Sequence, residues 1–207
     1  MNRRPGINTP INESAASSII DADLRKEFES LWAEADAIWE KNQNHPGFHA
    51  YVSADYEEVV KALADLRSQA FTFVEWGSGL GVVTIMASRM GYDAYGIEAE
   101  TALVDHAEVL AEKWGPDAQF TCGSFIPDNF EWDPGRGEEA VRTIIDVPAA
   151  YDDMDMEIRD FDLIYSYPWP TEHELYHNVM RDFAHGGSML LTYDAREGIG
   201  VVKRSEL

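Results

Sequence analysis

The chain has 207 residues, with 16 Lys and Arg against 38 Asp and Glu, which gives a formal net charge of −22 at pH 7. One α/β domain fits this length, and the 45% of apolar residues can form a sizeable core, which argues against global disorder. So acidic a surface disfavours nucleic acid and anionic lipid, and it attracts cationic ligands or basic partners. The single cysteine, Cys122, excludes an internal disulfide and favours a reducing, cytoplasmic environment. No apolar run approaches the length of a membrane span, and the first residues lack the apolar core of a secretory signal.

Residues 1–20 are rich in Ser, Asn, Pro and Ala, and we expect them to form a loose N-terminal arm. Residues 21–207 are expected to form one domain, which begins with N-terminal helices over 21–68. Apolar residues at spacings of three and four predict a first helix over 21–41. A second helix is predicted after an N-cap at Ser53, with an apolar stripe formed by Tyr56, Val59, Val60, Leu63 and Leu66.

From residue 71 onward the pattern alternates between short apolar runs and helical periods. The predicted strands are 71–76, 92–97, 118–122, 161–167 and 188–193, and the predicted helices are 81–90, 101–114 and 171–184. This alternation predicts βαβ units and a doubly wound, mostly parallel α/β sheet over 71–207.

Two further segments complete this α/β core. Residues 124–160 look like an acidic insertion with Pro and Gly punctuation. After the fifth strand, only 199–203 can supply a short sixth strand. A missing edge would leave the fifth strand for the N-terminal arm or another subunit to cover.

A glycine-rich turn follows the first predicted strand, in the segment Phe73-Val74-Glu75-Trp76-Gly77-Ser78-Gly79-Leu80-Gly81. Glycines are needed where the backbone turns sharply or where a ligand approaches the main chain closely. The start of the following helix offers free N–H groups to a ligand carboxylate or phosphate. A second acid, Glu98, ends the next strand, where a carboxylate can accept hydrogen bonds from ribose hydroxyls. The dinucleotide pattern G-x-G-x-x-G fails at Val82, which stands at the sixth position.

The pattern E-x-G-x-G-x-G instead resembles motif I of the class I methyltransferases that use S-adenosylmethionine. The resemblance implies a Rossmann-like core with this cofactor bound. The family's full sheet has seven strands, and because only 14 residues follow Tyr193, we expect this core to be shortened at its C-terminal end. It implies that the cofactor's methionine part is held by Glu75, Gly77, Ser78, Gly79 and Gly81, and its ribose by Glu98. The charge agrees, because the cofactor carries a sulfonium and an ammonium group. The alternative is a turn whose glycines serve only the packing of helix on strand.

The end of the third predicted strand carries two further candidates, Ser124 and Phe125. Methyltransferases of this family often have an acid at the position of Ser124, and it contacts adenine. A serine can also donate and accept hydrogen bonds. Phe125 can stack on the adenine or simply pack in the core.

The fourth predicted strand leads into Tyr167-Pro168-Trp169-Pro170. This stretch resembles the motif IV region, where amino-group methyltransferases carry Asn/Asp-Pro-Pro-aromatic, although Tyr167 and Trp169 replace the Asn/Asp and the second Pro. The resemblance implies that Tyr167, Pro168 and Trp169 face the substrate and exclude water. The alternative is a rigid turn before the next helix. A proton acceptor for the reaction is sought among Tyr167, Glu172 and His173.

The segment before the first strand has a weaker resemblance of its own. Tyr51 to Leu63 looks like the stretch that precedes motif I in a methyltransferase branch which includes the lysine methyltransferase of the ATP-synthase c subunit. In that branch the stretch lines the cofactor pocket. The resemblance therefore implies that Tyr51, Ser53 and Tyr56 line the pocket here.

A competing motif is His173-Glu174-Leu175-Tyr176-His177, which matches the H-E-x-x-H pattern of zinc hydrolases. Two histidines four residues apart share one helix face, and Glu197 could be a third ligand. The metzincin extension fails, because Met180 and Phe183 stand where a glycine and a third histidine belong. The predicted helix also lies inside a parallel sheet, which is not the usual setting of this motif.

These observations favour an S-adenosylmethionine-dependent methyltransferase that acts on an N or O nucleophile of a small molecule or a basic protein, with no metal. The main alternative is a catalytically degenerate module that binds the cofactor and has a regulatory role. A zinc-dependent hydrolase is the third possibility. The N-terminal helices and the 124–160 segment are the candidates for selecting the acceptor.

Overall fold

Six strands form one sheet in the order β3-β2-β1-β4-β5-β6 in the computed structural model, which describes residues 20–131, 142–144 and 147–207. The first five strands run parallel, and the sixth is antiparallel to the fifth. They are β1 (Thr72–Trp76), β2 (Asp93–Glu98), β3 (Gln119–Cys122), β4 (Leu163–Ser166), β5 (Met189–Asp194) and β6 (Gly198–Lys203). The expected doubly wound α/β sheet is therefore confirmed.

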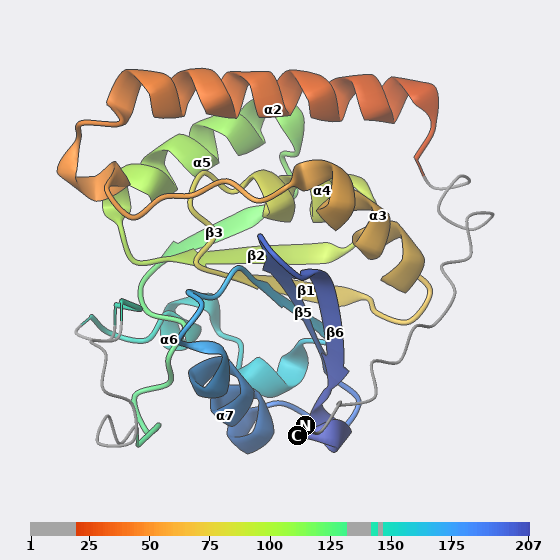
Figure 1. Cartoon of the computed structure of the whole chain (residues 1–207), viewed down its shortest axis with the longest axis vertical. Helices are drawn as coiled ribbons and strands as arrows, with labels where there is room; N and C mark the ends of the chain where they lie inside the picture. The colour runs from red at the N-terminus through yellow and green to blue at the C-terminus, as the bar shows by residue number, and fades with distance from the viewer. Residues whose placement is uncertain (1–19, 132–141, 145–146) are drawn as a thin grey trace.

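Helices cover both faces of this sheet (Figure 1). One face carries α3 (Tyr56–Leu66), α4 (Val82–Arg89) and α5 (Thr101–Trp114), and the long helix α2 (Ala22–Asn42) lies over α4 and α5. The other face carries α6 (Tyr151–Met154) and α7 (His173–Phe183). A short 3-10 helix, Pro46–Phe48, joins the N-terminal helices and contacts α5.

Alternate side chains of the central strand fill two separate hydrophobic layers. Phe73 packs with the helices α2 to α5, whereas Val74 and Trp76 pack with α6 and α7. All three are almost fully buried. This alternation follows from the two-residue period of a strand, and it makes β1 the centre of the molecule.

The predicted elements agree with the observed ones to within a few residues, and 101–114 matches α5 at both ends. One predicted cap is wrong. The N-cap of α3 is Asp55, whose side chain accepts hydrogen bonds from the amides of Glu57 and Glu58 at 3.0 and 3.2 Å. Ser53 lies two residues earlier, exposed, in the extended lead to the helix. Both residue types cap helices well. The helix begins at Tyr56, the first residue of the apolar stripe, so the N-cap is the residue directly before it, Asp55.

The short sixth strand expected over 199–203 is confirmed as β6. All six residues of β6 pair with β5, from Met189 opposite Lys203 to Asp194 opposite Gly198. Neither the N-terminal arm nor a second subunit is needed there, because a tight turn after Asp194 returns the chain antiparallel along β5.

Two other segments fall partly outside the described residues. The expected N-terminal arm lies outside them apart from residue 20, and so do parts of the 124–160 segment. Some of its described residues belong to the core, since Tyr151 and Ile158 are buried in the layer under α7. None of the described helices combines the length and the apolar composition needed to cross a membrane.

Candidate functional site

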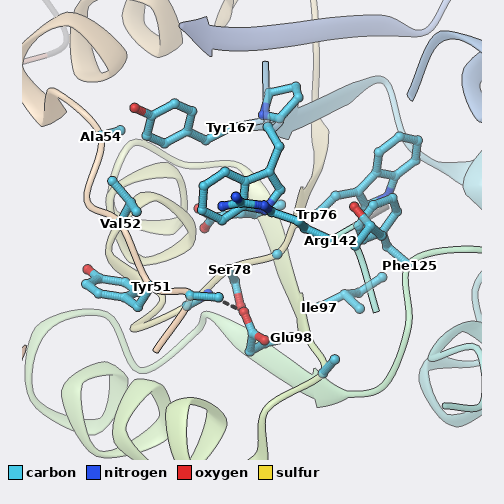
Figure 2. A pocket seen from close by; sticks show the side chains of 18 of the residues that line it. Tyr51, Val52, Ala54, Trp76, Ser78, Ile97, Glu98, Phe125, Arg142 and Tyr167 are labelled. Atoms are coloured by element: carbon cyan, nitrogen blue, oxygen red, sulfur yellow. Dashed lines mark hydrogen bonds between the residues drawn. The ribbon is translucent and has the colours of Figure 1, made fainter. Parts of the chain in front are cut away.

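A pocket of about 980 Å³ lies at the carboxyl ends of the parallel strands, where the chain order reverses between β1 and β4. In open α/β sheets this switch point is where ligands bind, because the two flanking loops diverge to opposite faces. The lining comes from the glycine turn, from the ends of β2, β3, β4 and β5, and from the 46–56 segment. Figure 2 shows the turn and Glu98 on one side and Tyr167 on the other.

The three glycines of the turn all adopt the left-handed conformation, with φ of 74° at Gly77, 55° at Gly79 and 73° at Gly81. They serve different contacts. No described atom lies within 4 Å of a Cβ placed on Gly77, whereas a Cβ on Gly79 would stand 2.6 Å from the Tyr51 ring. A Cβ on Gly81 would stand 2.4 Å from Phe120. Gly77 therefore opens the pocket and Gly79 admits Tyr51. Gly81 serves helix packing and is not among the described residues that line the pocket.

Glu98 joins the second strand to the glycine turn. Its Oε2 accepts a hydrogen bond from the Gly79 amide at 2.8 Å, and its Oε1 accepts one from the Glu100 amide at 3.0 Å. Burial raises the pKa of Glu98, and the backbone amides oppose that rise. A carboxylate has about four acceptor positions, so Glu98 can still accept hydrogen bonds from ribose hydroxyls. The side chain lines the pocket.

Glu75 is the buried acid at the end of β1. Its Oε2 accepts hydrogen bonds from the amide and the hydroxyl of Thr84, at 2.9 and 2.6 Å, on the first turn of α4. Burial raises the pKa of Glu75 to about 8, although the Thr84 bonds lower it and the nearby Glu98 adds to the rise. The unliganded pocket therefore holds Glu75 mostly neutral at pH 7, and a cation bound beside it would favour the ionised form.

Tyr51 and Ser78 complete the side of the pocket that contains the glycine turn. The Tyr51 hydroxyl lies 3.0 Å from the Tyr56 hydroxyl, and burial raises the pKa of Tyr51 to about 12. Both tyrosines line the pocket, as the sequence implies, whereas Ser53 does not appear in the described lining and is exposed. Ser78 Oγ is buried in the lining and has no hydrogen-bond partner among the described residues.

The end of β3 is more tightly closed than the sequence implies. Ser124 Oγ donates to the Ile144 carbonyl at 3.0 Å and accepts from the Ile126 amide at 3.1 Å. Phe125 stacks on Trp76 with ring centroids 5.0 Å apart and an interplanar angle of 11°. Both residues line the pocket. The Ser124 hydroxyl is thus already used to position residues 142–144, and one face of Phe125 is used for packing.

The loop after β4 forms the opposite wall. Tyr167, Pro168, Trp169 and Pro170 all line the pocket. Tyr167 meets Tyr193 edge to face, with ring centroids 4.9 Å apart, and the Arg142 guanidinium lies over the Trp169 ring at 4.5 Å from its centroid. The rings therefore form a largely apolar wall that lies across the pocket from Glu98.

The three candidate proton acceptors occupy different environments. Glu172 is 4% exposed and outside the described lining; it accepts hydrogen bonds from the amides of Arg142 and Thr143 and from the Thr143 hydroxyl. Its carboxylate therefore anchors a loop. Tyr167 and His173 both line the pocket, and His173 Nε2 faces Asp194 Oδ2 at 3.8 Å.

Sequence reasoning missed several residues of this site. Asp194 and Arg142 line the pocket, and the Tyr165 hydroxyl is buried there with no hydrogen-bond partner among the described residues. Asp194 directly follows the predicted strand 188–193 and could have been found by the rule that identified Glu98. The zinc hypothesis gains no support, because no three His, Cys, Asp or Glu side chains come together as metal ligands within the described ranges.

The pocket can be tested against S-adenosylmethionine on its own features. The open space at Gly77 leaves room for a ligand against the main chain. The buried Ser78 hydroxyl has no partner in the described part of the chain, which is costly, and a polar group of a ligand would satisfy it. Glu98 offers spare acceptor positions for hydroxyls, and Glu75 offers a carboxylate for a cation. These residues fit a nucleoside joined to an amino acid.

Solved structures of methyltransferases share this fold. The RNA methyltransferase from Salinibacter ruber, in complex with S-adenosyl-L-homocysteine, is 18% identical, with 69% of this chain and 78% of that chain covered and a TM-score of 0.50. The O-methyltransferase from Bacillus cereus, also in complex with S-adenosylhomocysteine, is 14% identical, with coverages of 88% and 71% and a TM-score of 0.52. No model of a known protein family matches the chain, and no curated protein sequence matches it either.

Proposed function

We propose that this chain transfers a methyl group from S-adenosylmethionine to a nitrogen or oxygen nucleophile. The observation that carries the proposal is the hydrogen bond from Gly79 to Glu98, because it places a carboxylate with spare acceptor positions beside an open glycine turn. The turn suits the amino-acid part of the cofactor, and Glu98 suits its ribose. The shared fold of solved structures that hold S-adenosylhomocysteine agrees with this assignment.

When bound, S-adenosylmethionine supplies a methyl group activated by a positively charged sulfur. The residues of this chain orient the two reactants and keep water away. Glu75 and Ser78 hold the amino-acid end, and Glu98 holds the sugar. The Tyr167–Pro170 wall restricts the acceptor on the other side. Positioning and desolvation of this kind can supply most of the rate enhancement of a displacement reaction.

Among the proton acceptors, the geometry favours His173 over Glu172. His173 lines the pocket and faces an aspartate, whereas the carboxylate of Glu172 is already used for backbone amides. Tyr167 lines the pocket, but burial raises its pKa above the ordinary value, which makes its hydroxyl a poor base at neutral pH.

We propose a small molecule or a basic protein as the acceptor. One solved structure of this fold is an RNA methyltransferase, but a net charge of −22 opposes a polyanionic substrate here. The replacements at Tyr167 and Trp169 favour a second candidate, a module that binds the cofactor without turnover. Binding of S-adenosylhomocysteine without methyl transfer to any of a panel of amines, phenols and basic proteins would support that module.

Titration calorimetry with S-adenosylhomocysteine, NAD and Zn²⁺ tests the proposal directly. We expect one equivalent of S-adenosylhomocysteine to bind, and neither NAD nor Zn²⁺ to bind at comparable concentration. Binding of NAD in its place would identify a dinucleotide site. Stoichiometric zinc that is lost in His173→Ala would restore the hydrolase hypothesis.

A further inference from the structure

We propose that the acceptor is an amine that enters this pocket as an ammonium ion, is held between Asp194 and the Tyr167 ring, and gives its proton to His173. This inference rests on the proposed methyl transfer and names the substrate class of the same site. It starts from residues at the carboxyl ends of β4 and β5, across the pocket from Glu98.

Asp194 is built as a fixed anion. Its Oδ1 accepts hydrogen bonds from the amides of Arg196 and Glu197, at 2.7 and 2.9 Å, in the turn that joins β5 to β6. These two bonds are the main reason that the pKa of Asp194 is lowered, so the carboxylate stays ionised at neutral pH. The other oxygen, Oδ2, faces His173, and Asp194 lines the pocket.

His173 is the first residue of α7 and contributes to the same wall. A neutral imidazole can accept a proton, and the Asp194 carboxylate lies 3.8 Å from the Nε2 of His173. The side chain of His173 is 37% exposed, so solvent can take the proton afterwards. In the proposal, Asp194 therefore attracts the ammonium to the base that takes its proton.

The remaining walls suit a cation. An aromatic ring attracts a cation within about 6 Å of its centroid. Arg142 already lies over Trp169, and the neighbouring Tyr167 ring, which lines the pocket and is half-buried, is the one that we assign to the acceptor. Tyr165 is only 2% exposed, lines the pocket, and carries a hydroxyl without a partner in the described part of the chain. A buried hydroxyl of this kind normally has a partner, and an N–H of an ammonium ion could donate to it.

The other charged groups of the pocket also favour a cation over an anion. Besides Asp194 and Glu197, the described lining contains the acids Glu98 and Glu100, against the two arginines Arg142 and Arg196. Glu75 also lines the pocket, and it is mostly neutral at pH 7 until a cation binds beside it. His49 and His177 also contribute to it. The whole chain is strongly acidic, which raises the local concentration of a cationic substrate.

The chemical step balances with these groups. The ammonium N–H proton passes to the imidazole of His173, which frees the nitrogen lone pair. The nitrogen uses that pair to bond to the methyl carbon, the carbon–sulfur bond breaks, and sulfur keeps the two electrons of that bond. An amine that stays protonated has no lone pair for attack, so the proton must leave first.

Calorimetry on the protein loaded with S-adenosylhomocysteine can test the ammonium site with n-butylammonium, 1-butanol and butyrate as probes. We expect n-butylammonium to bind at least about tenfold more tightly than 1-butanol, and butyrate not to bind. Asp194→Asn should remove this preference. Asp182→Asn, which alters an exposed ion pair on α7 outside the described lining, should keep it.

Equal binding of 1-butanol, tighter binding of butyrate, or a preference that survives Asp194→Asn would overturn the proposal. The ammonium site and the proposed methyl transfer can fail independently of each other. If S-adenosylhomocysteine itself does not bind, the methyltransferase assignment fails, and the same probes on the unloaded protein still decide whether the ammonium site exists.

NMR of the imidazole resonances gives a second measurement. If Asp194 had only a structural role, the probe would not change these resonances. We expect added n-butylammonium to shift the His173 resonances. The chain provides a matched control in His185, whose Nε2 lies 3.6 Å from Asp162 Oδ1, outside the described lining of the pocket. Its resonances should stay in place, and a probe that shifts both or neither would contradict the site.

Discussion

The amide of Gly79 donates a hydrogen bond to Glu98 at 2.8 Å, and this bond fixes the glycine turn to the end of the neighbouring strand. Gly79 can take this position because its φ is +55° and because the Tyr51 ring occupies the space where a side chain would stand. A single carboxylate thus shapes the turn and faces the ligand. Substitutions of Glu98 that keep one side-chain oxygen should therefore differ in their effect from those that remove both.

Glu98→Ala should weaken the binding of S-adenosylhomocysteine at least tenfold, about 1.4 kcal/mol, because it removes every acceptor for the sugar and for Gly79. Glu98→Gln retains one oxygen for Gly79 and should lose less. Calorimetry checks both variants, with Glu108→Gln on the exposed face of α5 as the control. Wild-type affinity in Glu98→Ala would remove the main support for a ribose site.

The affinity for S-adenosylhomocysteine should depend on pH through Glu75. Burial raises the pKa of this acid to about 8, so it is mostly neutral below that pH. The ammonium of the ligand favours the carboxylate, so binding releases a proton. We therefore expect the affinity to rise as the pH increases towards about 8, and to be nearly independent of pH over that range in Glu75→Gln. A pH-independent wild type would place the ammonium elsewhere.

The same acid should make the unliganded protein less stable as the pH rises. Its folded-state pKa of about 8 lies above the ordinary value of 4.5, so between these values the folded state holds a proton that the unfolded state has lost. The contribution of Glu75 to the free energy of unfolding is therefore largest below the ordinary pKa and falls as the pH rises through that window. Urea unfolding of the wild type and of Glu75→Gln at several pH values in this window measures the free energy of unfolding, which should fall with rising pH more steeply in the wild type.

The sequence predicts the parts of the site that one strand end and one turn specify together. Gly77, Gly79 and Glu98 follow from a short local pattern, because positive φ angles require glycine and parallel strands end on the same edge. Asp194 was within reach of the rule that identified Glu98, because it stands at the end of a strand. Arg142 was not, because its role depends on a loop folded against distant elements. The buried carboxylate of Glu172 shows the same limit, since a residue adjacent to His173 in sequence binds the backbone of residues about 30 positions away.

The two outer glycines of the turn should respond differently to alanine. Both have positive φ, which costs a non-glycine residue about 1–2 kcal/mol. Gly81→Ala also drives a Cβ to 2.4 Å from Phe120, and overpacking of this kind adds about 1–3 kcal/mol. Urea unfolding should rank Gly81→Ala as the less stable. Gly77→Ala should instead lose affinity for S-adenosylhomocysteine, because its methyl group enters the pocket.

Tyr165→Phe should leave the stability of the unliganded protein unchanged or slightly raise it. The hydroxyl is buried without a partner among the described residues, so its removal relieves a desolvation cost. Tyr92→Phe is the control, since its hydroxyl donates to the Leu63 carbonyl at 2.7 Å and its loss should cost about 1 kcal/mol. A clear loss of stability in Tyr165→Phe would mean that the hydroxyl is satisfied within the protein.

Glu172 should behave as an anchor of the pocket rim. Its carboxylate accepts hydrogen bonds from the backbone of Arg142 and Thr143, and Arg142 lies over Trp169. Glu172→Ala leaves those amides unpaired, so we expect faster cleavage by trypsin after Arg142. Glu174 is exposed on the same helix, and trypsin should cleave the Glu174→Ala variant as fast as it cleaves the wild type. An unchanged cleavage rate after Arg142, together with a loss of methyl transfer, would return Glu172 to the candidate bases, because the defect would then lie in the chemistry and not in the position of the loop.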